Sequence, residues 1–127
     1  MTFDPTAAPV AFLYAADRDR ALAFYCGTLG MSLHSSDPFG DFIDLAGRGL
    51  ARLTVLPGYQ AGAHPMFGWN VSDIAGAVRT LVERGVVMTR YDGMDQDELG
   101  IWTSPDGAAK VAFFADPDGN VLSLAQA

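Results

Sequence analysis

Apolar and polar positions follow the same order twice along the chain, at a constant separation of 56 positions. Tyr14 corresponds in this way to Asn70, and Asp17 corresponds to Asp73. In each copy a strand-like stretch precedes the aspartate, and a helical stretch with apolar residues three and four positions apart follows it. The repeat predicts two similar modules whose inner faces form the working cleft of the protein.

The first copy predicts one helix and four strands. Asp17 can accept hydrogen bonds from the free N–H groups of the first helical turn, and Gly30 is suited to end the helix. The apolar stripe of this helix has to lie on a sheet. Turn residues separate the strands, which we expect at about residues 9–16, 31–36, 40–46 and 50–56.

The second copy predicts a helix from Ser72 or Asp73 to Gly85. Its strands are expected at about residues 65–71, 86–91, 109–115 and 120–125. We interpret residues 92–108 as an insertion that contains an acidic loop and a short extra strand. The acidic loop fits a lid over the cleft and a solvated surface loop equally well.

Together the elements predict an α+β fold of two tandem βαβββ modules, which form a curved, partly open mixed sheet with the helices outside. A chain of 127 residues suits one domain, residues 1–127, with module one at about 8–58 and module two at about 64–126. The single cysteine, Cys26, leaves no internal disulfide possible.

The net charge of −7 has the wrong sign for binding nucleic acid or an anionic membrane surface. No apolar run approaches the roughly 20 residues that cross a bilayer, and the first residues lack the basic start of a signal peptide. We therefore expect a cytoplasmic protein whose partner is a small molecule.

Two motifs carry a family resemblance. They are Asp-x-x-x-Ala-Leu-x-Phe-Tyr-x-x-x-Leu-Gly at residues 17–30 and Asp-Pro-Asp-Gly-Asn-Val-Leu-Ser-Leu at residues 116–124. With the two βαβββ units, they make the chain similar to the vicinal oxygen chelate superfamily, which includes glyoxalase I, bleomycin-resistance proteins and extradiol dioxygenases. The resemblance covers about residues 8–126. It implies the fold more strongly than the function, because this fold carries several unrelated chemistries.

The resemblance also implies four metal-ligand positions, at Val10, Arg52, Met66 and Ser123. Val10 has no donor atom, Met66 offers a soft thioether, and Ser123 is neutral where a carboxylate would stand. The permanent charge of Arg52 repels a dication. We therefore expect no metal and no other cofactor.

Strand alternation predicts an apolar cleft with a few polar points. Arg52 either orients a ligand or forms a structural ion pair with an acid such as Asp44 or Glu98. The predicted ligand-binding residues are Phe12, Tyr14, Arg52, Thr54, Met66, Asn70, Trp102, Phe113 and Ser123.

Two functions compete. The first is a metal-free protein that binds a small organic molecule, anionic or carbonyl-bearing, in its apolar cleft. The second is a lyase, isomerase or dioxygenase-type enzyme with non-standard catalytic groups, for which Asp97 and Glu98 are the strongest acid–base candidates. The sequence does not decide whether the protein is an enzyme. Open sheet edges and the short two-module chain predict a homodimer.

Overall fold

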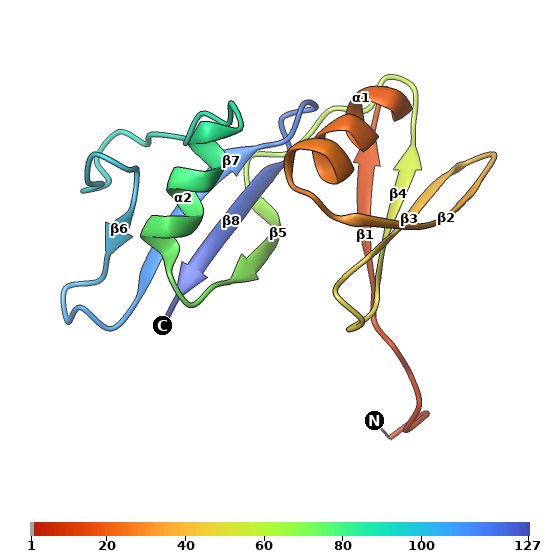
Figure 1. Cartoon of the computed structure of the whole chain (residues 1–127), viewed down its shortest axis with the longest axis horizontal. Coiled ribbons are helices and arrows are strands. Elements are labelled where there is room, and N and C mark those ends of the chain that lie inside the picture. Colours follow the sequence, from red (N-terminus) through yellow and green to blue (C-terminus); the bar gives the residue numbers. More distant parts are fainter. Residues whose placement is uncertain (1) are drawn as a thin grey trace. The chain divides into compact units, whose positions relative to one another are not determined.

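The computed structural model describes residues 2–127, and the chain divides into two compact units after Tyr59. Each unit contains one four-stranded mixed sheet and a helical segment between its first and second strands (Figure 1). The predicted α+β class and the two βαβββ-like modules are therefore confirmed. Among residues 2–127, no helix has the length and apolar character needed to cross a membrane.

The first unit forms a sheet with the strand order β1-β4-β3-β2. Its elements are β1 (Val10–Ala15), α1 (Arg18–Leu22), the π-helical turn η1 (Ala23–Thr28), β2 (Ser32–Asp37), β3 (Gly40–Asp44) and β4 (Leu50–Val55). Strands β1 and β4 are parallel, whereas β3 is antiparallel to both β2 and β4. All four strands predicted for this module are present.

The helical segment of the first unit begins and ends where the sequence predicts. The Asp17 side chain accepts a hydrogen bond from the Arg20 N–H at 3.0 Å, which satisfies a free donor of the first turn. The segment widens from α1 into η1 and stops at Gly30, whose φ of 75° favours glycine. It buries Ala21 and Tyr25.

Alternation along β1 separates the two faces of the first sheet. Leu13 and Ala15 are fully buried on the face that α1 and η1 cover, together with Ile43 and Leu53. Phe12, one position before Leu13, is 57% exposed. The sheet therefore has one covered face and one open face, as expected from strand geometry.

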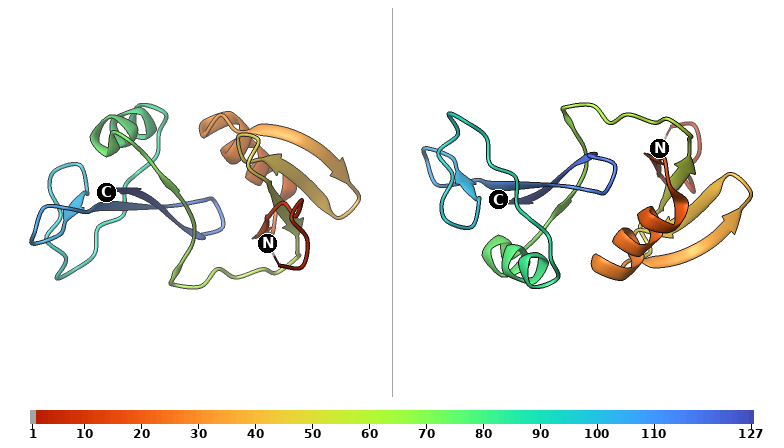
Figure 2. Two further views of the ribbon diagram at one scale, coloured as in Figure 1. Left: turned by 90° about the horizontal axis from the view of Figure 1, so that it is seen from below. Right: turned by 90° about the horizontal axis from the view of Figure 1, so that it is seen from above.

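The second unit has the corresponding order β5-β8-β7-β6. Its elements are β5 (Pro65–Asn70), α2 (Ile74–Glu83), β6 (Trp102–Thr103), β7 (Lys110–Ala115) and β8 (Val121–Gln126). The Asp73 side chain caps α2 by accepting from the Gly76 N–H at 3.1 Å. Helix α2 packs on β7 and β8, and both views in Figure 2 show it on one side of this sheet.

The strand predicted at 86–91 is wrong, because this segment is irregular and Val87 is 84% exposed. The short β6 pairs with β7 instead. The Gln96 side chain takes the place of a neighbouring strand: its amide nitrogen donates to the carbonyls of Thr89 and Gly100, and its oxygen accepts from the Tyr91 N–H. A side chain thus satisfies backbone groups that a continuous strand would pair. The short extra strand predicted within 92–108 is present as β6.

Candidate functional site

Arg52 lies in the middle of the open face of the first sheet. Across the strands it is in register with Phe12 of β1 and Phe42 of β3. The Arg52 Cζ atom is 4.6 Å from the centroid of the Phe42 ring, within the range of a cation–π interaction. The Arg52 side chain is only 12% exposed. A cation is therefore set between two aromatic rings on this face.

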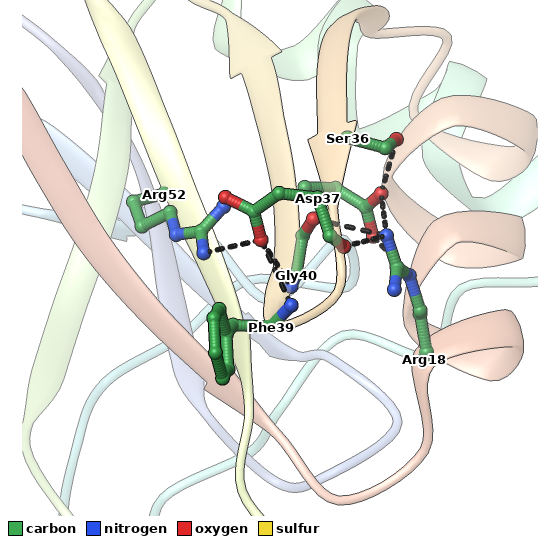
Figure 3. Close-up of polar contacts among 7 residues, drawn as sticks. Arg18, Ser36, Asp37, Phe39, Gly40 and Arg52 are labelled. Atoms are coloured by element: carbon green, nitrogen blue, oxygen red, sulfur yellow. Dashed lines mark hydrogen bonds and ion pairs between the residues drawn. The ribbon is translucent and has the colours of Figure 1, made fainter.

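The two terminal nitrogens of Arg52 have different surroundings. Nη2 donates to Asp37 Oδ1 at 2.8 Å (Figure 3). Nη1 is buried, and no residue in the range 2–127 accepts a hydrogen bond from it. A buried donor without an acceptor is costly in a protein, so this nitrogen is the chemically unsatisfied point of the face.

Asp37 stands at the turn between β2 and β3. Its Oδ1 also accepts from the backbone N–H groups of Phe39 at 2.8 Å and Gly40 at 3.1 Å. The hydrogen bond from Arg52, followed by the one from Phe39, lowers the pKa of the Asp37 carboxyl below its usual value. The Asp37 side chain is 39% exposed, so solvent weakens the ion pair.

Arg52 therefore forms an ion pair with an acid, as one of the two predicted alternatives had it, but the acid is Asp37 and neither of the two suggested, Asp44 and Glu98. Asp44 accepts from the Gly47 N–H at 2.9 Å, and the Glu98 carbonyl oxygen accepts from Arg90. Asp37 was not considered from the sequence as a partner of Arg52. The turn between β2 and β3 brings the Asp37 side chain over the open face, where it meets Arg52.

A second arginine holds the same hairpin from the covered face (Figure 3). Arg18 Nη2 donates to Asp41 Oδ1 at 2.9 Å and to the carbonyl oxygens of Asp37 at 2.8 Å and Gly40 at 2.9 Å. Asp41 is fully buried and also accepts from the Ser36 hydroxyl at 2.6 Å. This contact is structural, because it ties the first residue of α1 to the β2–β3 hairpin and its charges are paired.

The other predicted residues of the first unit also lie on β1 and β4. Tyr14 and Thr54 are opposite each other, and the Tyr14 ring is 5.7 Å from the ring of Tyr59, centroid to centroid. Phe12, Tyr14 and Arg52 alternate with buried residues and so share the open face. Sequence reasoning missed Phe42, although its place between Asp41 and Ile43 on β3 was a usable alternation signal.

In the second unit, residues in register on neighbouring strands form two rows across the open face. The first row consists of Gly68, Ser123 and Phe113. The second row begins at Asn70, passes through one residue each of β8 and β7, and ends at Trp102. Sequence reasoning missed Tyr91, whose ring meets the Phe113 ring edge to face with centroids 5.5 Å apart.

A register shift between Pro65 and Phe67 interrupts the pairing of β5 at Met66. Met66 is 39% exposed, and the interrupted ladder leaves it outside the regular alternation that placed it in the predicted cleft. The structure therefore brings Asn70, Trp102, Phe113 and Ser123 onto one face without assigning Met66 to it.

In the acidic loop, the Asp97 carboxylate binds the backbone of the loop itself. Asp97 Oδ1 accepts from the backbone N–H groups of Leu99 and Ile101, each at 2.9 Å. The Asp97 and Glu98 carbonyl oxygens accept from Arg90. These contacts shape the loop around its own backbone, which gives Asp97 a structural role beside its predicted acid–base role.

The four positions that the family pattern assigns to a metal do not fit one. Arg52 presents a guanidinium cation, and the chain has an alkyl group at Val10 and a neutral hydroxyl at Ser123. Within residues 2–127, no group of three or more His, Cys, Asp or Glu side chains is arranged to hold a metal ion. Of the two histidines, His34 Nδ1 lies 3.1 Å from the Ser35 hydroxyl on the exposed strand β2.

Residues 6–124 match the family described as the Glyoxalase/Bleomycin resistance protein/Dioxygenase superfamily. No curated protein sequence matches the chain. Among solved structures, the chain is similar to a superfamily member from Sphaerobacter thermophilus, with 26% identity, a TM-score of 0.70, and coverage of 96% of this chain and 98% of that one.

Two further solved structures share the fold at lower identity. One is TnmS3, an antibiotic-binding protein from Streptomyces, with 22% identity, a TM-score of 0.65 and 95% coverage of both chains. The other is a lactoylglutathione lyase from Agrobacterium tumefaciens, with 22% identity, a TM-score of 0.67, and coverage of 97% of this chain and 95% of that one.

Proposed function

The chain belongs to the glyoxalase/bleomycin resistance protein/dioxygenase superfamily, and on this basis we propose that it binds a small organic molecule through Arg52 without a metal ion. The family resemblance predicted from the sequence is confirmed. Because proteins of this fold include both a binding protein and an enzyme, the choice between the two functions has to rest on the residues of this chain.

One observation carries the proposal. Arg52 Nη1 is a buried donor for which the described residues supply no acceptor. A ligand oxygen at this nitrogen would make a charge-assisted hydrogen bond and remove the cost of the unsatisfied group. The exposed ring of Phe12, beside Arg52 in the sheet, offers apolar contact area for the rest of the ligand.

The chemistry of the face favours binding over catalysis. A general base has to lie within hydrogen-bond reach of substrate, and its pKa has to suit proton transfer near neutral pH. Asp37 is the acid next to Arg52, and its lowered pKa makes it a weak base. A binding role requires only the donor and the aromatic surface.

The proposed ligand contacts in the first unit are Phe12, Tyr14, Arg52 and Thr54, with Phe42 supporting the guanidinium from β3. In the second unit, Asn70, Trp102, Phe113 and Ser123 share an open face and remain proposed contacts. Met66 remains a proposed contact on its exposure alone.

The test is a screen of small aromatic ketones, amides and carboxylates by NMR of the isotope-labelled protein. Compounds that bind should shift the signals of Phe12 and Arg52. Arg52→Met should weaken the affinity for these compounds by about 10- to 100-fold, the usual effect of losing one charge-assisted hydrogen bond. Arg48→Met, which removes an exposed arginine of the same unit, should leave the affinity unchanged.

Binding that is insensitive to Arg52→Met would refute the proposal. Elemental analysis of the purified protein tests the metal-free part, because one tightly held equivalent of a divalent metal would contradict it. Turnover of a bound compound, detected as product in the same samples, would identify the protein as an enzyme.

A further inference from the structure

The charge around Arg52 is already balanced within the protein. The guanidinium carries one positive charge, and the Asp37 carboxylate, 2.8 Å from Nη2, carries one negative charge. The lowered pKa of Asp37 keeps this carboxylate ionised at neutral pH. A ligand that reaches Nη1 therefore meets a neutral ion pair and not a free cation.

The geometry also limits what Arg52 can donate. Arginine binds a carboxylate most strongly when two of its N–H groups donate in parallel. Here Nη2 is engaged by Asp37, and the Phe42 ring lies 4.6 Å from Cζ against the guanidinium. Nη1 is buried, and no residue in the range 2–127 accepts a hydrogen bond from it. A carboxylate that accepted hydrogen bonds from both Nη1 and Nη2 would have to share Nη2 with Asp37.

An anionic ligand at Nη1 would also lie near a like charge. Nη1 and Nη2 share one carbon atom, so a carboxylate on Nη1 comes within a few ångströms of the Asp37 carboxylate. Repulsion at this range offsets much of the attraction to the guanidinium. A neutral carbonyl oxygen accepts the same hydrogen bond without this repulsion.

We infer that the Arg52 face selects a neutral carbonyl compound, an aromatic ketone or amide, over the corresponding carboxylate, with Asp37 as the residue that sets this selectivity. The flat ring of such a compound would rest on Phe12, which is 57% exposed beside Arg52. The inference rests on the proposed function and narrows its ligand class from anionic or carbonyl-bearing to neutral carbonyl-bearing.

Two probes of the same shape test the selectivity: 2-naphthamide, which is neutral, and 2-naphthoate, which is anionic. Dissociation constants are measured at pH 7 by NMR titration for the wild type, Asp37→Asn and Arg52→Met. We expect the wild type to bind the amide about tenfold more tightly than the carboxylate, because the repulsion acts on only one probe. Asp37→Asn should reverse the order, because it removes the like charge and keeps the acceptor for the Phe39 and Gly40 N–H groups.

The outcomes separate the inference from the proposed function. If the wild type prefers naphthoate, and Arg52→Met abolishes that binding, then the selectivity is wrong and the proposed function stands. If neither probe binds, or Arg52→Met changes neither affinity, then both fail. A preference for the amide that persists unchanged in Asp37→Asn would overturn the role of Asp37. Asp37→Ser, whose hydroxyl also accepts turn hydrogen bonds, repeats the comparison if Asp37→Asn does not fold.

Discussion

Phe12 and Leu13 are neighbours on β1 with opposite surroundings, and truncating each one tests the division between the open and the covered face. Leu13 is fully buried, whereas Phe12 is 57% exposed. The two variants, Phe12→Ala and Leu13→Ala, change adjacent positions of the same strand. Differences in backbone hydrogen bonding therefore cancel to a large extent, and the side-chain environment remains as the main variable.

The expected losses follow from burial. Fully burying a phenylalanine side chain contributes about 1.5 to 3 kcal/mol, and Phe12 is less than half buried, so Phe12→Ala should lower the free energy of unfolding by about 0.6 to 1.3 kcal/mol. Leu13→Ala removes a fully buried side chain and leaves a cavity, which costs about 2.7 to 5 kcal/mol.

Urea unfolding of the wild type and both variants measures these losses, and an unchanged slope with denaturant shows that they are comparable. Naphthamide titration of Phe12→Ala adds a functional reading, since the proposed ring contact should be lost while the fold persists. A loss above about 2.5 kcal/mol for Phe12→Ala would refute the reasoning, because it would mean that the ring is covered in solution.

Four further outcomes are expected. Gly68→Ala should destabilise the second unit by about 1 to 3 kcal/mol, since the added Cβ would lie 2.7 Å from the Ser123 carbonyl oxygen; calorimetry measures this, and an unchanged melting temperature would contradict it. Gln96→Ala should speed amide hydrogen exchange at Tyr91, whose N–H donates to the Gln96 side chain, and unchanged exchange there would show that this bond gives no protection. The lowered pKa of Asp37 stabilises the folded state above the unfolded value of about 4, and this contribution is lost as the pH falls through the folded pKa, so acid titration of Asp37→Asn should show a smaller loss than the wild type. Sedimentation equilibrium should show the predicted homodimer, and a single 13.5 kDa species would refute it.

The regular elements could be predicted from the sequence because their signals are local. Asp17 and Asp73 cap helices as expected, and the alternation of β1 correctly assigns Leu13 to the covered face. Helix capping and strand alternation depend on residues a few positions apart, so one sequence contains the information.

The errors arose where a side chain from elsewhere decided the local structure. Apolar residues at 86–88 suggested a strand, but the segment is irregular. Its backbone is held at Thr89, whose N–H donates to Phe113 of β7 and whose carbonyl accepts from the Gln96 side chain seven positions later. The contact between Asp37 and Arg52 was not predicted, because the two residues are 15 positions apart in sequence. The turn brings Asp37 to Arg52 only once the hairpin has folded. Neither contact produces a periodic pattern of residues in the sequence from which it could be predicted.

The replacement of a strand by the Gln96 side chain has a consequence for how the second half of the chain can diverge after a duplication. Backbone pairing fixes the length of a connection, because inserting a residue shifts every later partner to the opposite face. Here one amide group, and not a run of backbone, links Thr89, Tyr91 and Gly100. A change in the number of residues between Tyr91 and Gln96 would alter a local turn, in which the Met94 N–H donates to the Tyr91 carbonyl, and not the pairing of the strands. The sheet would keep its register while new loops are sampled in this half.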